Sequence, residues 1–340
     1  MNIGCWNFYE NLNTNNSLFL NPDAGIGDNL LLPFNKLYLY GEERGVYFKT
    51  LDVIEDFTKI DTFIFFDYPD MSNKYVKMAF KLNTPKYLVI FESPIIKPDN
   101  WNTKNHYFFK KIFTWNDKYV DNQKYFKINL PSEFGKSINI NNKIDIEQKM
   151  CVVISGNKRV ENSLELYSKR QETIRWFERN HLEDFDLYGY GWDKYVYFNR
   201  YVNSFLNKFK IPVILSHRYP SYKGAVKVKK SVLEMYKFSI CYENARDISG
   251  YVTEKIFDCF SAGCVPIYWG AEDITQHVPG NCFIDRRDFD NHESLYEYIS
   301  EINDCEYKLF LENINLFLKS DMSDKFRSSF FIDTIMSNLE

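Results

Sequence analysis

Short apolar blocks alternate with polar segments along the first half of the chain and predict strands separated by helices and loops. The predicted strands are rich in β-branched and aromatic residues and are bounded by Asp, Asn or Pro. They cover residues 3–8, 62–66, 87–91 and 111–114. A helix is predicted over residues 73–82, between two of these strands. Strands that alternate with helices are typical of an α/β domain with a parallel sheet.

The second half repeats this rhythm after a segment rich in Asn, Lys and Ser, residues 132–149, which is predicted to be a linker. The continuous apolar run at residues 151–155 is of the kind found in buried parallel strands. Further strands are predicted at residues 186–188, 238–242, 265–269 and 282–284, and helices at residues 163–180, 253–262, 294–301 and through most of 307–336.

This pattern predicts two doubly wound α/β domains. The N-terminal domain is expected over residues 1–140, the C-terminal domain over residues 150–320, and a helical tail over residues 321–340. Ligands of such sheets bind beyond the carboxyl ends of the strands, and a cleft between two domains is the expected place for an active site.

Composition and charge narrow the class of protein. The 340 residues suit about two domains, and 45% hydrophobic with 26% charged residues excludes global disorder. The net charge of -4 argues against a nucleic-acid binder. The sequence contains no apolar run long enough to span a bilayer and no secretion signal of the usual design. Seven cysteines without a CxxC pair predict buried, reduced thiols and no zinc site. We therefore expect a cytoplasmic protein, either free or peripheral at a membrane surface.

The helix predicted at residue 253 has unusual chemistry in its first turn. Thr253 is a good N-cap, Gly263 suits the residue that follows the last turn, and Glu254 and Lys255 lie directly after the cap. Free amides and the helix dipole make this end an anion site, whereas a lysine there opposes the dipole unless an anion lies nearby. A phosphate would supply that anion. The spacing alone fits equally well a surface Glu–Lys pair on an amphipathic helix.

Around this helix, the sequence resembles the donor-binding signature of the α-1,3/1,4-fucosyltransferases. The matching residues are Tyr242-Glu243-Asn244, Tyr251-Val252-Thr253-Glu254-Lys255 and the run GCVPIYWG from Gly263 to Gly270. Upstream, Phe91-Glu92-Ser93-Pro94 resembles the segment that holds the proposed catalytic base of that family. Ser155-Gly156-Asn157, followed by Arg170, resembles the loop and arginine that grip the donor diphosphate.

The resemblance implies a GT-B fold, in which two Rossmann-like domains face a central cleft, and an inverting transfer of fucose from GDP-fucose to a hydroxyl of a glycan acceptor. It implies Glu92 as general base, with Arg170 and Lys255 stabilising the GDP leaving group. The other donor-binding residues that it implies are Ser155, Asn157, Asn244, Tyr251 and Glu254. Other cationic residues that compete for the role of Arg170 are Arg159, Lys169 and Arg175.

The residue types suit this chemistry. A positioned base contributes roughly 10²–10⁴ in rate, and cationic side chains stabilise the charge that builds on a departing diphosphate. No cofactor or metal is then required, although a divalent ion could assist. Two literal DxD patterns, Asp184-Phe185-Asp186 and Asp288-Phe289-Asp290, are interpreted as structural. The alternatives left open are transfer of another nucleotide-activated deoxy-sugar, and a glycan- or nucleotide-binding module without catalysis. An oxidoreductase is disfavoured, because Gly25-Ile26-Gly27 is a broken dinucleotide fingerprint and is predicted to be a loop.

Overall fold

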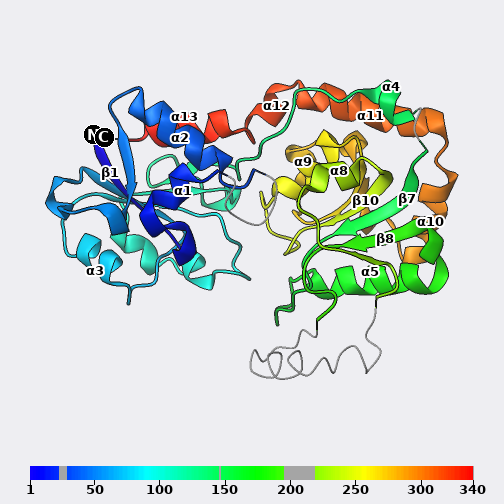
Figure 1. Cartoon of the computed structure of the whole chain (residues 1–340), viewed down its shortest axis with the longest axis horizontal. Helices are drawn as coiled ribbons and strands as arrows, with labels where there is room; N and C mark the ends of the chain where they lie inside the picture. The colour runs from blue at the N-terminus through cyan, green and yellow to red at the C-terminus, as the bar shows by residue number, and fades with distance from the viewer. Residues whose placement is uncertain (23–28, 145–146, 195–218, 340) are drawn as a thin grey trace. The chain divides into compact units, whose positions relative to one another are not determined.

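The computed structural model describes residues 1–22, 29–144, 147–194 and 219–339. The chain divides into two compact units (Figure 1). The first unit comprises Met1–Glu133, Ser249–Tyr251 and Asp321–Glu340, and the second unit comprises Phe134–Ile248 and Val252–Ser320. Each unit is therefore assembled from segments that are distant in the sequence.

A parallel six-stranded sheet forms the centre of the first unit. Its order is β2 (Tyr47–Thr50), β1 (Asn2–Asn7), β3 (Thr62–Phe66), β4 (Lys86–Val89), β5 (Lys111–Thr114) and β6 (Tyr125–Lys127). Every residue of β3 and β4 is buried, as expected for parallel strands covered on both faces.

Two apolar clusters cover the faces of this sheet. One contains residues of α1 (Ser17–Leu20), α2 (Leu32–Glu42) and α13 (Ser328–Ser337), and the other contains residues of α3 (Lys74–Phe80). The short helix α12 (Asp321–Asp324) precedes α13. In the first cluster, Phe34 of α2 packs edge-on against Phe66 of β3 and Phe331 of α13. Residues from near the end of the sequence therefore complete a core that begins at residue 3.

The second unit has its own parallel six-stranded sheet. Its order is β12 (Ile284–Asp285), β11 (Val265–Trp269), β10 (Tyr236–Tyr242), β7 (Lys149–Ile154), β8 (Phe185–Tyr188) and β9 (Tyr222–Gly224). Helix α5 (Tyr167–Asn180) lies on one side of this sheet, and α8 (Lys229–Leu233) and α9 (Glu254–Ser261) lie on the other (Figure 1). The remaining described helices are α4 (Ile140–Ile144), α10 (His292–Glu301) and α11 (Asp304–Leu318).

Two doubly wound α/β domains were expected, and the two parallel sheets confirm this fold class. The strands predicted at 62–66, 111–114 and 265–269 have the observed bounds. The pattern missed α1, α2, α4, α8 and the three strands β2, β6 and β9, and α4 lies within the segment predicted to be a linker. These strands have only three or four residues, and α2 contains Pro33 and Gly41, which weaken a helical pattern. The Gly25–Gly27 motif lies outside the described residues.

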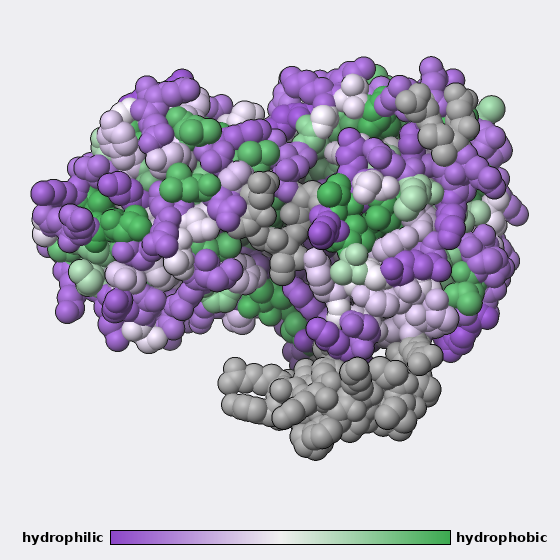
Figure 2. Space-filling model, viewed as in Figure 1, coloured by the Kyte–Doolittle hydropathy of each residue, from purple (hydrophilic) through white to green (hydrophobic). Residues whose placement is uncertain are grey.

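The surface, the cysteines and the helix lengths can be compared with the expectations from composition. The face of the molecule seen in Figure 2 is largely hydrophilic, with hydrophobic residues scattered over it. All seven cysteines are free and six are buried, as the sequence predicted, while Cys305 is exposed. Among the described residues, none of the helices combines the length and apolarity that a bilayer crossing requires.

Candidate functional site

Most of the predicted donor-binding residues lie beyond the carboxyl ends of β10 and β7, which are neighbours in the second sheet. β10 ends at Tyr242 and leads into Glu243 and Asn244, while β7 ends at Ile154 and leads into Ser155. Because the strands are parallel, both loops leave the same edge of the sheet, where ligands of α/β proteins bind.

Glu243 organises the end of β10. Its side chain is fully buried, and it accepts hydrogen bonds from the backbone N–H of Thr253 (2.9 Å) and from the Thr253 hydroxyl (2.7 Å). Thr253 is the N-cap of α9, and its hydroxyl also accepts from the N–H of Lys255. The buried carboxylate therefore fixes the start of α9 against the end of β10.

Lys255 is the cationic partner of this carboxylate. Its Nζ lies 3.1 Å from Glu243 Oε2, 2.9 Å from Thr253 Oγ1 and 3.9 Å from Glu254 Oε1. Burial lowers the pKa of Lys255, but the charges of Glu243 and Glu254 outweigh burial and raise the pKa above its ordinary value. Two of the three ammonium hydrogens serve Glu243 and Thr253, so one N–H remains without a hydrogen bond among the described residues. That donor suits an anionic oxygen.

Glu254 connects this pair to a second lysine on α8. Glu254 Oε1 lies 3.7 Å from the Nζ of Lys229, which in turn forms an ion pair of 2.7 Å with Asp258. Burial raises the pKa of Glu254, but the charges of Lys255 and Lys229 outweigh burial and hold the pKa at about 2. Glu254 is therefore ionised at neutral pH, and its carboxylate can accept hydrogen bonds from sugar hydroxyls.

Arg170 of α5 approaches the same strand end from the other side of the sheet. Its Nη2 donates to the carbonyl oxygens of Tyr242 (2.7 Å) and Glu243 (3.1 Å), and the residue is 4% exposed. Burial lowers the pKa of Arg170. Contact with a diphosphate would use the other guanidinium nitrogens, while Nη2 holds the loop. Of the competing cations, Arg159 is exposed, Lys169 pairs with Glu172 and Arg175 pairs with Glu178.

The loop after β7 is held by its backbone and leaves one buried hydroxyl without a partner. Ser155 N–H donates to Tyr188 O, and Ser155 O accepts from the indole N–H of Trp192 (2.6 Å). Ser155 Oγ is buried without a hydrogen bond among the described residues. Asn157 Oδ1 accepts from Gln171 Nε2 of α5 (3.0 Å). Within the described part of the chain, the Ser155 hydroxyl is therefore unbonded, whereas both polar side-chain atoms of Asn157 have hydrogen bonds.

Replacing Gly189 with alanine should destabilise the second unit and weaken nucleotide binding. Gly189 has φ +128°, and a Cβ there would collide with the carbonyl oxygen of Ser155. We expect a loss of about 1–3 kcal/mol from the backbone conformation alone and a larger loss with the collision. Thermal unfolding and calorimetry with GDP measure the two effects.

Gly224 supplies the matched control. It also has a positive φ (+114°), but a Cβ there would meet open space. Gly224→Ala therefore reports the conformational cost without the collision. Equal losses from both variants would mean that the contact with Ser155 is unimportant.

The other two predicted donor residues have different surroundings. Asn244 is half-buried, and its carbonyl oxygen accepts from Leu166 N–H, which joins this loop to the start of α5. Tyr251 belongs to the first unit, is 2% exposed and packs against Trp115 with ring centroids 4.8 Å apart. The structure therefore places six of the seven predicted donor residues in the second unit and Tyr251 in the first.

The predicted base lies in the first unit, just beyond β4. Glu92 is half-buried, and its Oε1 accepts a hydrogen bond of 2.6 Å from the hydroxyl of Tyr9, which follows β1. Its backbone carbonyl accepts from the indole N–H of Trp101 (3.1 Å). Oε2 has no hydrogen bond among the described residues, so it is able to receive a proton. Like the loops of the second unit, Glu92 lies at the carboxyl edge of its own sheet.

Side chains able to hold a metal also occur in the second unit. His181, Glu183 and Asp184 bring three potential ligand atoms within 4.8 Å of one another. The ring of His181 stacks on Tyr296, whose hydroxyl donates to Asp184 (2.6 Å). In the first DxD pattern, Asp186 is 4% exposed and binds Lys149, Lys223 and the hydroxyl of Tyr236. These contacts give Asp186 a structural role.

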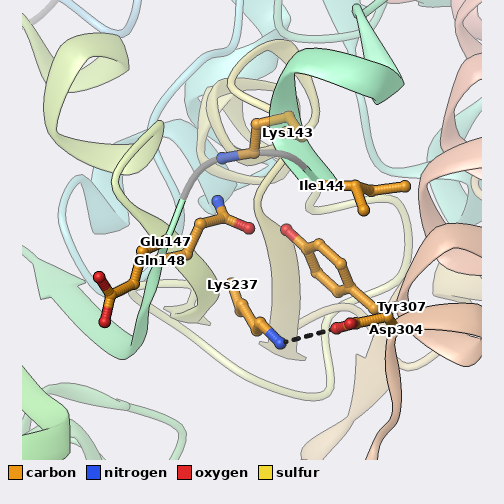
Figure 3. A pocket seen from close by; sticks show the side chains of 7 residues that line it. All are labelled: Lys143, Ile144, Glu147, Gln148, Lys237, Asp304 and Tyr307. Carbon is orange, nitrogen blue, oxygen red and sulfur yellow. Dashed lines mark hydrogen bonds and ion pairs between the residues drawn. The ribbon is translucent and has the colours of Figure 1, made fainter.

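A separate pocket of about 250 Å³ lies at the opposite edge of the second sheet, beside the first residue of β7 and the start of β10 (Figure 3). Its wall includes Lys143, Gln148, Tyr307 and the ion pair between Lys237 and Asp304 (3.4 Å). Lys143 Nζ donates to Glu234 O. The pocket lies away from the strand ends that carry the predicted site.

Sequence reasoning missed three contributors to these arrangements. Glu243 was quoted in the motif without a role, and Tyr9 was not considered. Asp67, which follows β3, contacts the loop of Glu92. The available signal was positional, since all three follow predicted strands at the edge where ligands bind.

Part of the second half of the chain is similar in sequence to a known protein family. Residues 192–316 match the model of the C-terminal region of glycosyltransferase family 10, the fucosyltransferases. An α-(1,3)-fucosyltransferase of Helicobacter pylori is 37% identical over 78 residues, which are 23% of this chain and 16% of the relative. An α-(1,4)-fucosyltransferase of Arabidopsis thaliana is 38% identical over 69 residues, which are 20% of this chain and 17% of that relative. The matched stretch therefore spans about a sixth of the length of these relatives, and within it the resemblance to the family is confirmed.

Solved structures resemble the chain over its whole length. An α1,3-fucosyltransferase aligns with 100% of this chain and 89% of its own, at 15% identity and a TM-score of 0.55. A structure of an α1,3-fucosyltransferase with GDP aligns with 99% of this chain and 90% of its own, at 16% identity and a TM-score of 0.56. An α-glucosyltransferase in complex with UDP and DNA aligns over 99% of both chains at 11% identity and a TM-score of 0.58. At these identities the likeness shows the fold, and it supports the GT-B assignment of the two α/β units.

Proposed function

We propose that this chain, which carries the C-terminal domain of the fucosyltransferase family over residues 192–316, is an inverting glycosyltransferase that moves fucose from GDP-fucose to a glycan hydroxyl. The observation that carries the proposal is the agreement between the family match and the geometry of the second unit. Within the matched segment lie Glu243 and Lys255, whose ion pair places an ammonium N–H at the ligand edge of the sheet. The mammalian relatives and structural neighbours named for fucosyl transfer support the donor.

The reaction needs one bond broken, one formed and one proton moved. The acceptor oxygen attacks the anomeric carbon of fucose from the face opposite GDP, so the configuration inverts. The bond between that carbon and the β-phosphate oxygen breaks, and GDP leaves with the electron pair. The acceptor proton passes to a carboxylate, for which we propose Glu92 Oε2. No oxidation occurs, and no metal is required for the balance.

Charge stabilisation of GDP falls to the second unit. Lys255 would donate its remaining N–H to a diphosphate oxygen, and Arg170 would add its buried charge beside the same loop. Both interactions strengthen as negative charge collects on the leaving group, so they should affect turnover more than donor binding. Ser155 Oγ and Glu254 are proposed to bind the phosphate and the sugar hydroxyls, respectively, while Asn157, Asn244 and Tyr251 are proposed to shape the donor pocket.

The donor is tested with a panel of nucleotide sugars. We expect GDP release from GDP-fucose in the presence of a 4-galactosyl-N-acetylglucosaminide, the acceptor in the name of a mouse relative that is 35% identical over 81 residues, 23% of this chain and 22% of that relative. Structural neighbours bound to UDP make UDP-glucose the matched comparison donor. Release from UDP-glucose or a GDP-linked deoxy-sugar other than fucose, with none from GDP-fucose, would exclude the assignment of fucose.

A binding module without catalysis remains the second candidate. Its distinguishing result is GDP binding, measured by calorimetry, without release of GDP from GDP-fucose under any acceptor or by hydrolysis in water. The structure favours catalysis over this candidate, because Glu92 lies at the ligand edge of its sheet with one carboxylate oxygen available.

A further inference from the structure

Asp67 occupies an unusual backbone position next to the proposed base. It is the first residue after β3 and has φ +63°, a left-handed conformation that non-glycine residues rarely adopt. Its own N–H donates to the carbonyl of Val89, the last residue of the neighbouring strand β4. The side chain is 3% exposed. The chain therefore holds a buried carboxyl group between two adjacent strand ends.

One oxygen of this carboxyl group holds the backbone of the Glu92 loop. Asp67 Oδ1 accepts hydrogen bonds from the N–H of Phe91 (2.8 Å), the N–H of Glu92 (2.9 Å) and Nδ2 of Asn100 (2.6 Å). Asn100 is itself fully buried, and its Oδ1 accepts from Tyr68 N–H (2.6 Å). The backbone N–H of Glu92 is thus held by the buried carboxyl group of Asp67, which is itself held by Asn100.

The side chain of Glu92 is held from a second direction. Tyr9 binds Oε1, so the main-chain contact through Asp67 and the side-chain contact through Tyr9 together determine where Oε2 points. Displacement of a reacting group by about 1 Å can cost roughly 10²-fold in rate. Hydrogen bonds that fix the loop of Glu92 would therefore contribute to the rate.

We propose that Asp67 is a positioning residue for Glu92, acting through the hydrogen bonds that its Oδ1 accepts from the backbone of residues 91 and 92. The inference rests on the proposed function, because positioning matters only if Glu92 receives the acceptor proton. The charge of Asp67 is not what the role requires. An acceptor oxygen at that place is sufficient.

The pKa of Asp67 is consistent with a role that requires an acceptor oxygen and not a negative charge. Burial is the largest cause that raises the pKa of Asp67, and the charge of Glu92 adds to it. The three hydrogen bonds to Oδ1 lower the pKa, and the balance puts it at about 7. Near neutral pH the group therefore exists partly in its neutral form. Asparagine reproduces that form, tolerates a positive φ and retains an acceptor at Oδ1.

The test compares Asp67→Asn with Asp67→Gly. Glycine adopts φ +63° freely and removes the whole side chain with its carboxyl group. For GDP-fucose and a 4-galactosyl-N-acetylglucosaminide, we expect Asp67→Gly to lower kcat by about 10- to 100-fold and Asp67→Asn to stay within about threefold of the parent. The KM for GDP-fucose and the affinity for GDP should not change, because the donor residues Lys255 and Arg170 belong to the other unit.

Asn122→Gly is the matched control, since Asn122 is an exposed residue of the first unit with φ +56°. It should leave kcat unchanged, and thermal unfolding should show all three variants folded. A loss of kcat in Asp67→Asn equal to that in Asp67→Gly would overturn the inference and indicate that the charge of Asp67 acts directly. Unchanged kcat in Asp67→Gly would also overturn it and leave the proposed function intact. If the unaltered protein releases no GDP, the proposed function fails first, and with it the need to position Glu92.

Discussion

Replacement of Glu92 by glutamine is expected to lower kcat for fucosyl transfer by about 10²- to 10⁴-fold, the contribution of a positioned general base. Glutamine has nearly the shape of glutamate and can still accept the hydrogen bond of 2.6 Å from Tyr9 through its amide oxygen. It cannot take the acceptor proton. The affinity for GDP should be unchanged, because the residues proposed to bind GDP lie in the second unit, apart from Tyr251. Steady-state kinetics and calorimetry measure the two quantities.

Glu10→Gln supplies the control for this experiment. Glu10 is an exposed carboxylate of the first unit whose Oε1 accepts from Asn73 Nδ2 (3.0 Å). Its replacement should leave kcat unchanged. If Glu92→Gln retains the turnover of the parent protein, another group takes the proton and the role assigned to Glu92 is wrong.

Replacement of Lys255 by methionine is expected to weaken GDP binding by about 10- to 100-fold, the equivalent of one charge-assisted hydrogen bond of roughly 1.5–3 kcal/mol. The effect on kcat should be larger, because charge on the diphosphate grows in the transition state. The variant also leaves the fully buried Glu243 without its cation. Losing one partner of a buried ion pair costs about 3–5 kcal/mol of stability, so the single variant alone could lose binding by partial unfolding.

The double variant Glu243→Gln/Lys255→Met separates these causes. It removes both charges together, so the stability lost in the single variant should largely return while GDP binding stays weak. Lys230→Met, on an exposed lysine of α8, controls for the loss of one positive charge. Recovery of parental GDP affinity in the double variant would show that Lys255 serves only to neutralise Glu243. Calorimetry with GDP and thermal unfolding provide both readouts.

The sequence predicted the fold where the hydrophobic pattern was long or continuous. The nearly continuous apolar run of β3 and the alternation of strand and helix around α9 are typical of a buried parallel sheet. Three of the four outer strands, β2, β6 and β9, could not be predicted, because each has only three or four residues, too few to show a hydrophobic period. Edge strands are specified by their neighbours in the sheet rather than by their own residues.

The same limit applies to the site. Thr253, Glu254 and Lys255 are adjacent in sequence, so their gathering at the start of α9 was predictable from local chemistry. On spacing alone, Lys255 fits a pair with its helix neighbours Glu254 or Asp258, whereas its shortest ion pair is with Glu243, twelve residues away. Asp258 instead pairs with Lys229. The link between Asp67 and Glu92 spans twenty-five residues and exists only because β3 and β4 are neighbours.

The packing of α13 into the first unit has a consequence for how the protein is made. Synthesis delivers β1 to β6 early, but Phe331 and Ile332, which close the cluster around Phe34, leave the ribosome only after every segment of the second unit. Domains generally fold during translation in the order in which they emerge. Here the unit that begins first would finish last, and its uncovered aromatic face is where we expect chaperones to engage the nascent polypeptide.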